Sequence, residues 1–170
     1  MSETPKTKLI DIAEVQRLHL IEYLSPHQSP YLLRELEGRI KHYRTYSADY
    51  TTLLYTAVEG DGQYTIYDAV ATKGGSYEYI IEIKDRTGSA STTVNDWRID
   101  LNKYQELKKH SRAIVCCLFS DVAVEWDLRY STATPVVSRN QPRTTAVYNG
   151  RTTKSQVAFK LNEGIITKYK

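Results

Sequence analysis

The 170-residue sequence has no long hydrophobic run and only two cysteines. No stretch reaches the roughly 18 apolar residues that a membrane-spanning helix needs, so we expect no membrane partner. The first six residues are polar and include an acid, without the basic and then apolar pattern of a secretory signal. Cys116 and Cys117 are adjacent in an apolar run. Neighbours on a strand point to opposite faces, so the pair is poorly placed for a disulfide.

The two cysteines are therefore expected to be buried thiols in a reducing compartment. This predicts a cytoplasmic protein. Neither cysteine has zinc-ligand spacing, so the sequence does not predict a zinc site.

The four histidines are expected to be structural, because none has a nucleophile or a metal partner at a recognisable spacing. His19 lies within the first predicted helix, and the other three are expected at helix ends or on the surface: His27, His42 and His110. Four tyrosines are expected to complete the core rather than stack on bases: Tyr43, Tyr46, Tyr50 and Tyr55.

Charge is distributed unevenly along the chain. Residues 1–100 hold 11 Lys and Arg against 15 Asp and Glu, whereas residues 101–170 hold 12 against 5. From Arg129 onward eight basic residues face a single acid, Glu163. Such a region is typical of a protein that binds a polyanion, although a solvated basic surface has the same composition. Four residues are candidates for nucleic-acid contacts: Arg86, Arg143, Arg151 and Lys154.

Hydrophobic periodicity predicts both helices and strands. Helical spacing is present in three stretches: about 11–25, from Pro30 through Tyr43, and from a Thr93 cap to about His110. Stretches rich in Thr, Tyr and aliphatic residues, separated by Gly-rich turns, predict three antiparallel strands: 50–58, 63–72 and 77–85. The Lys73–Ser76 segment is the second of these turns.

The second half of the chain begins with a continuous apolar run at 113–119, which is typical of a central strand covered on both faces. A strand at 122–128 is expected to pair with it. Residues 130–141 are predicted to be an extended loop, followed by short strands: 146–149, 155–161 and 165–169. We therefore predict a single α/β domain over 1–170, with a mixed β-sheet flanked by helices. Its core spans about 30–128, with an appended basic C-terminal β region at about 129–170.

The chemically informative stretch is the predicted strand 77–85. Alternation places Glu82 and Lys84 on one face and Ile81 and Ile83 on the other. Asp68 is the only acid of the preceding strand, and the short connecting turn can bring it beside Glu82. Burying a lone carboxylate in a strand is costly, and a divalent cation that takes oxygen ligands resolves this cost. The alternative is an exposed cross-strand ion pair between Glu82 and Lys84 on a solvated sheet face.

A Glu-x-Lys triplet alone carries little information, because a chain of this length contains one by chance about half the time. Glu106-Leu107-Lys108 is a second instance, and it lies in a predicted helix, where it is expected to be a surface charge pair. The first triplet is distinguished by its strand setting, the preceding Asp68 and the helix that follows.

An acid on one strand, Glu-x-Lys on the next, then an amphipathic helix and an apolar strand resembles the core of the PD-(D/E)XK nuclease superfamily. The resemblance covers about residues 50–128 and implies a restriction-endonuclease-like fold. It implies that Asp68, Glu82 and the main-chain carbonyl of Ile83 bind Mg²⁺ or Mn²⁺. It also implies that Lys84 assists the attack of water on a phosphodiester, with DNA the favoured substrate. The pattern is similar to that of small nucleases from bacteriophages and bacteria, which places the protein in the host cytoplasm if a phage encodes it. Many small relatives work as dimers, so a homodimer is one alternative for an oligomeric state that the sequence leaves open.

The sequence departs from the family pattern at two places. Tyr67 stands where the motif name has a proline, and the helix after the motif carries Lys103-Tyr104-Gln105 in place of a Gln and a Tyr one turn apart. Lys103 or Gln105 is a candidate for a phosphate contact. Glu35 is a candidate for a further metal ligand, the alternative being an acid on a helix surface.

Two functions follow from these patterns. The first is a metal-dependent nuclease that hydrolyses phosphodiester bonds with a metal-activated water. The second is a nucleic-acid-binding or assembly protein that keeps the fold without catalysis.

Overall fold

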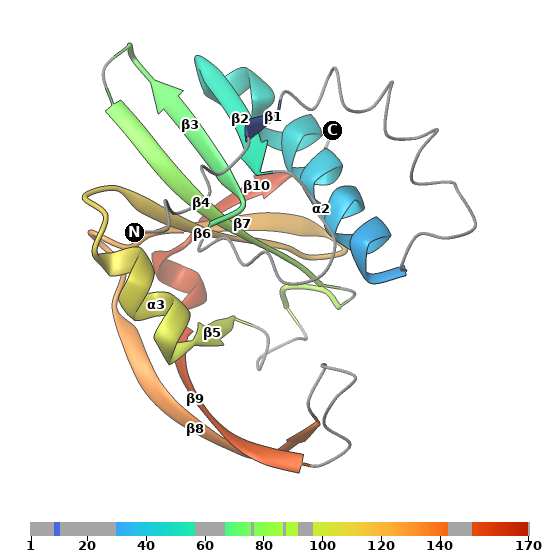
Figure 1. The fold of residues 1–170 in the computed structure, drawn as a ribbon, viewed down its shortest axis with the longest axis vertical. Helices are drawn as coiled ribbons and strands as arrows, with labels where there is room; N and C mark the ends of the chain where they lie inside the picture. The colour runs from blue at the N-terminus through green and yellow to red at the C-terminus, as the bar shows by residue number, and fades with distance from the viewer. Residues whose placement is uncertain are drawn as a thin grey trace, which may run out of the picture.

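The computed structural model describes residues 9–10, 30–56, 67–75, 77–86, 88–91, 97–142 and 151–169, with side chains described in these ranges except at 9–10, 30–33, 138–142 and 151–154. In chain order the elements are β1 (Leu9–Ile10), α2 (Pro30–Tyr46), the short 3-10 helix η1 (Ser47–Asp49), β2 (Thr52–Thr56), β3 (Ala69–Lys73), β4 (Tyr77–Asp85), β5 (Arg98–Asp100), α3 (Leu101–Lys108), β6 (Ala113–Leu118), β7 (Val122–Asp127), β8 (Ala133–Pro142), β9 (Arg151–Phe159), the 3-10 helix η2 (Leu161–Glu163) and β10 (Ile165–Lys168). They form a mixed α/β fold dominated by strands (Figure 1). No described helix combines the length and hydropathy needed to cross a membrane.

Helix α2 begins at Pro30, a residue suited to the first helical turn, as the sequence predicted. Its apolar stripe packs on the large sheet through the buried Leu36 and the partly buried Ile40 and Tyr43. The helix predicted over about 11–25 lies outside the described residues.

Strands β2, β3 and β4 form the predicted antiparallel meander. The turn between β3 and β4 contains Gly74 and Gly75 with φ values of 65° and 82°. Residues with side chains rarely adopt these angles, so two glycines allow the chain to reverse sharply here. The resulting register places Ala69 opposite Ile81, which fixes the position of Asp68 relative to Glu82.

All six residues of strand β6 are buried, as the continuous apolar run predicted. It lies between β4, to which it is parallel, and β7, to which it is antiparallel. The large sheet has the order β1-β2-β3-β4-β6-β7-β10, and β4–β6 is its parallel pair among the described strands. Because parallel neighbours need a crossover connection, the segment containing β5 and α3 passes over one face of the sheet.

The predicted helix from Thr93 to His110 is wrong at residues 97–100, and its residues 93–96 lie outside the described ranges. Helix α3 begins only at Leu101, and Arg98–Asp100 form strand β5, which pairs with β9. Ile99 is buried directly opposite Val157. Pairing with a strand almost 60 residues away therefore overrides the local helical periodicity.

The extended loop predicted at 130–141 is also wrong. Residues Ala133–Pro142 form β8, which pairs with β9 in a three-stranded sheet of order β5-β9-β8. Pro135 is tolerated because β8 is an edge strand of this sheet. The two strands form a long curved ribbon that extends away from the large sheet (Figure 1).

The C-terminal β region is not simply appended. Strand β10 pairs with β7 and becomes an edge strand of the large sheet, as a short strand at 165–169 predicted. Strand β9 contains the predicted strand residues Ser155–Phe159 and contributes two buried side chains to the core: Val157 and Phe159. The strand predicted at 146–149 lies outside the described residues.

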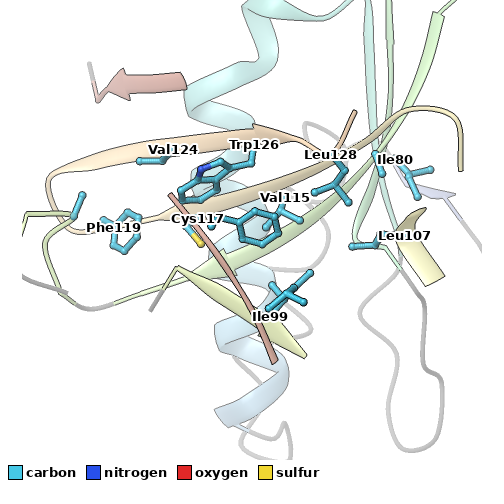
Figure 2. Packing of buried hydrophobic residues seen from close by; sticks show 13 residues of the cluster. Ile80, Ile99, Leu107, Val115, Cys117, Phe119, Val124, Trp126 and Leu128 are labelled. Atoms are coloured by element: carbon cyan, nitrogen blue, oxygen red, sulfur yellow. The ribbon is translucent and has the colours of Figure 1, made fainter. Parts of the chain in front are cut away.

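Two hydrophobic clusters cover the two faces of the large sheet. The first packs under α2 and includes Leu36 and Ile81. The second lies under α3 and the smaller sheet, where Trp126 stacks on Phe159 with ring centroids 5.5 Å apart. Figure 2 shows Ile80, Cys117 and Trp126 in this second cluster. Both faces of β4 and β6 are therefore covered by protein.

Candidate functional site

Strand β4 sends alternate side chains to the two sides of the sheet. Ile81 belongs to the cluster under α2, whereas Ile80 belongs to the cluster on the α3 side. Glu82 faces α3 as well and contacts Lys103 of that helix. The face assignment made from strand alternation is therefore confirmed.

Glu82 is buried, with 4% of its surface exposed. Its Oε1 lies 3.6 Å from the Lys84 Nζ, and its Oε2 lies 3.4 Å from the Lys103 Nζ. Among the described residues, Oε2 has no hydrogen bond of good geometry, and its close contact is the ion pair with Lys103. The carboxylate thus has one oxygen that is buried and incompletely satisfied.

Burial raises the pKa of Glu82 to about 8, and the nearby charge of Asp68 adds to this effect against the opposing charges of Lys84 and Lys103. Burial disfavours the charged form of Lys84, but the combined negative charges of Glu82, Asp68 and Asp100 outweigh it and raise the pKa of Lys84. Lys84 therefore remains a cation, and its side chain is 31% exposed. A partly exposed ammonium beside a buried carboxylate can contact an anionic ligand.

Asp68 immediately precedes β3, one position beyond the Ala69–Ile81 pair, and is not inside the strand as the sequence predicted. Its backbone N–H donates to the carbonyl of Ile81 at 2.8 Å. Its carboxylate Oδ2 accepts a hydrogen bond from the backbone N–H of Ile83 at 2.8 Å. The charge of Asp68 acts on the pKa of both Glu82 and Lys84, so the three predicted residues lie together.

Arg39 is a site residue that the sequence analysis missed. This guanidinium from α2 is 4% exposed and reaches Asp68 Oδ1 at 3.2 Å. It also donates to the backbone carbonyl and the hydroxyl of Thr56, at 3.0 and 2.9 Å. Position 39 falls on the apolar stripe of α2, three residues after Leu36 and four before Tyr43. A lone arginine on such a stripe is the pattern that could have identified it.

Glu35 does not reach the two central carboxylates directly. Its Oε2 pairs with Arg39 Nη1 at 2.8 Å, one turn along α2. Arg39 in turn contacts Asp68, so Glu35 is joined to the site through one intervening side chain. The structure thus brings Glu35 near the site as a partner of an arginine.

The two candidates on α3 behave differently. Lys103 reaches Glu82, whereas Gln105 is exposed and has no described contact with the site. Residues two apart on a helix point about 200° apart, so only one of the two can face the sheet.

Arg86 is half-buried just beyond the end of β4, and its charge acts on the pKa of Lys84. Its Nε is buried without a hydrogen-bond partner among the described residues. Arg86 is therefore close enough to the predicted site for its charge to act on it. The side chains of Arg143, Arg151 and Lys154 lie outside the described residues.

The oxygen donors at this site fit a hard divalent cation. Asp68 and Glu82 supply carboxylates, and one Glu82 oxygen is buried without a hydrogen bond. The N–H of Ile83 points to Asp68, and the N–H and carbonyl of one strand residue point to the same side, so the Ile83 carbonyl is directed there as well. Oxygen-only ligation of this kind suits Mg²⁺ or Mn²⁺.

Formal charge at the site is balanced by the protein alone when Glu82 is ionised. Three carboxylates face three cations: Glu35, Asp68 and Glu82 against Arg39, Lys84 and Lys103. A divalent cation therefore adds two uncompensated positive charges, which an anionic ligand can offset.

The alternative of an exposed ion pair on a solvated sheet face is wrong, because the Glu82 side chain is only 5% exposed. The second Glu-x-Lys triplet is different. Glu106 makes a surface ion pair with Lys109 at 2.7 Å, and Lys108 donates to the backbone carbonyl of Leu128 at 3.1 Å. The expected surface pairing in this triplet thus involves Lys109 and not Lys108.

Comparisons with protein families, curated proteins and solved structures gave no match to this chain.

Proposed function

We propose that this chain is a divalent-metal-dependent nuclease of the PD-(D/E)XK type that hydrolyses phosphodiester bonds, with DNA the favoured substrate. One observation carries the proposal. A buried glutamate, Glu82, lies beside Lys84 on a central strand, while Asp68 immediately precedes the neighbouring strand β3. Buried carboxylates are retained at a cost to stability, which a functional role explains.

The order of elements also supports a restriction-endonuclease-like core. Strands β2, β3 and β4 form a meander, α3 follows in the crossover, and the apolar β6 lies parallel to β4. This is the succession of acid-bearing strand, Glu-x-Lys strand, helix and apolar strand on which the resemblance rests.

Each site residue has a distinct proposed role. Asp68, Glu82 and the Ile83 carbonyl hold Mg²⁺ or Mn²⁺, which when bound supplies Lewis acidity and lowers the pKa of water. Lys84 remains protonated, so it acts as a cation that holds a phosphate oxygen and not as a base. Lys103, beside Glu82, and Arg86, whose charge acts on Lys84, add further positive charge at the site.

A second candidate function is a nucleic-acid-binding or assembly protein that keeps this fold without catalysis. One observation favours it. Arg39 and Lys103 already neutralise the two central carboxylates, and the raised pKa of Glu82 favours its protonated form near neutral pH. Such a protein needs no metal and binds DNA through its basic surface, with a strong dependence on salt.

The test is cleavage of single-stranded, duplex and branched DNA by the purified chain in Mg²⁺ or Mn²⁺. The Lys84→Ala variant is expected to lose at least 100-fold of the activity. Lys108→Ala is the matched control, because it removes the lysine of the other Glu-x-Lys triplet and is expected to retain activity.

Absence of cleavage on every substrate, or equal activity of wild type and Lys84→Ala, would contradict the nuclease. Salt-dependent DNA binding that ignores metal and survives Asp68→Asn would then support the second function. The homodimer expected from the resemblance stays a prediction, and sedimentation analysis tests it.

A further inference from the structure

A second cluster of metal-ligating side chains lies on the opposite side of the sheet from Glu82. His42 of α2, Cys116 of β6 and Glu125 of β7 have ligand atoms that all lie within 4.8 Å of one another. Cys116 and Glu125 are direct partners in the β6–β7 register, so their side chains project to the same face. His42 approaches that face from the helix packed on it.

The cluster is in the protein core and not on its surface. His42 and Cys116 are fully buried, and Glu125 is half-buried. The sequence had indicated a structural His42 at a helix end or on the surface. It lies near the C-terminal end of α2, but it is fully buried and not on the surface. The burial removes it from water, so each of its ring nitrogens needs a partner within the protein.

Only one of these nitrogens has such a partner. Nδ1 of His42 lies 2.6 Å from the Tyr55 hydroxyl. Nε2 has no hydrogen-bond partner among the described residues, although it is buried. When the hydroxyl accepts a hydrogen bond from Nδ1–H, the lone pair is on Nε2. Metal-bound histidines show this arrangement, in which the second ring nitrogen is held by a neighbouring group.

The carboxylate is oriented in a similar way. The Tyr50 hydroxyl donates to Glu125 Oε1 at 3.2 Å, which leaves the other oxygen for a further ligand. Two tyrosines thus hold two members of the cluster from outside it. These tyrosines complete the core, as the sequence predicted, and they also position polar side chains within it.

We propose that His42, Cys116 and Glu125 bind one zinc-type transition-metal ion that ties α2 to strands β6 and β7. The donor set of one nitrogen, one sulfur and one oxygen suits a borderline-soft ion and not Mg²⁺. A thiolate and a carboxylate together neutralise a divalent ion, so the loaded core carries no net charge. Binding releases the Cys116 thiol proton to solvent.

The geometry needs only a small adjustment. Zinc bonds of about 2.0–2.3 Å place the ligands of a tetrahedral ion about 3.3–3.8 Å apart. The present spread of up to 4.8 Å therefore closes by about 1 Å around an ion. Three protein ligands leave one position of the tetrahedron for a further donor.

Cobalt(II) provides the test, because it takes zinc sites and gives a thiolate charge-transfer absorption band. The full-length chain is stripped with a chelator, dialysed and titrated with Co²⁺, then with Zn²⁺. Wild type is expected to show a thiolate band that saturates at one equivalent of Co²⁺, and to unfold at a higher temperature with Zn²⁺ than without it.

Cys117→Ser is the matched control for Cys116→Ser. Cys117 is the adjacent residue, is equally buried, and points into the cluster on the other side of the sheet (Figure 2). The band is expected to survive in Cys117→Ser and to disappear in Cys116→Ser. Glu125→Gln keeps the shape of the side chain and is expected to bind Co²⁺ at least tenfold more weakly, with a circular dichroism spectrum like that of wild type.

Three results would overturn the proposal: no thiolate band in wild type, an unchanged band in Cys116→Ser, or a loss of the band in Cys117→Ser as large as that in Cys116→Ser. The site is independent of the proposed nuclease. Glu82→Gln is expected to keep the band whether or not DNA is cleaved, so the two proposals fail separately.

Discussion

The Oε2 of Glu82 and the Nζ of Lys103 lie 3.4 Å apart, and they come from a central strand and from the helix that crosses over it. Lys84 approaches the other oxygen of the same carboxylate. The site is therefore held together by contacts within the protein, which the proposed binding of a metal and a phosphate would rearrange. Four consequences of this geometry and of the surrounding packing can be measured.

Stability in the absence of metal is expected to fall as pH rises. The folded state raises the pKa of Glu82 from 4.5 to about 8, so between these values the folded chain holds a proton that the unfolded chain has lost. Unfolding free energy then decreases with pH, by up to about 1.4 kcal/mol per unit from this group. Glu82→Gln is expected to remove this slope. Urea unfolding of both proteins in EDTA from pH 4.5 to 8 gives the comparison, and parallel curves would contradict the burial argument.

Loss of Arg39 is expected to be strongly destabilising. The guanidinium contacts Glu35, Asp68 and Thr56, and it is 4% exposed. Removing one partner of a buried ion pair costs about 3–5 kcal/mol, because the remaining charge is left uncompensated. Arg39→Met is therefore expected to lower the denaturant midpoint substantially.

Exposed Arg44, in the last turn of the same helix, supplies the control for this substitution. Arg44→Met is expected to change stability by at most about 0.5 kcal/mol. Similar losses of stability in Arg39→Met and Arg44→Met would show that Arg39 contributes helix packing and not charge compensation.

Metal and DNA are expected to bind cooperatively. The carboxylates of the site are already balanced by Arg39, Lys84 and Lys103, so Mg²⁺ alone introduces unfavourable charge. Phosphates offset it, and by linkage Mg²⁺ raises the affinity for DNA by the same factor. In a cleavage-deficient Lys84→Ala chain, Mg²⁺ is expected to strengthen DNA binding at least tenfold. Anisotropy titrations measure the effect, and an equal gain in an Asp68→Asn, Lys84→Ala double variant would place the metal elsewhere.

Two glycine-to-alanine substitutions are expected to change the stability of the fold in opposite directions. At Gly164, which precedes β10, a Cβ would clash with Val124 and lie 3.0 Å from the Trp126 Nε1. Overpacking of this kind costs about 1–3 kcal/mol. At Gly38, inside α2, a Cβ meets only Asp85 at an ordinary 3.5 Å. Gly38→Ala is expected to stabilise the chain by up to about 1 kcal/mol through helix propensity. Thermal unfolding distinguishes the two, and a shift of the same sign in both would contradict this packing.

Strand alternation was sufficient to predict the central part of the site. The faces of Glu82 and Lys84 follow from the period of β4, and the two-glycine turn returns the chain so that Asp68 is brought alongside. These relations are local, within about 20 residues. The polar candidates on α3 could likewise be identified from the sequence. The structure was needed to show that Lys103, and not Gln105, is the one that faces the site.

The features that were missed depend on contacts distant in sequence. Strand β5 exists because β9 pairs with it, and nothing within residues 93–110 encodes that partner. Arg39 meets Asp68 across 29 positions. His42 and Cys116 lie 74 positions apart, so no spacing rule connects them. Topology, which periodicity does not specify, brings these residues together.

Adjacent positions of β6 belong to different layers of the molecule, with Cys116 under α2 and Cys117 under α3 and the smaller sheet. Each thiol becomes available to a labelling reagent only when the layer covering it opens. In single-cysteine variants, the labelling rates thus separate the opening free energy of the helix layer from that of the β8–β9 layer. Two neighbouring residues thereby act as independent reporters of local unfolding on the two sides of one sheet.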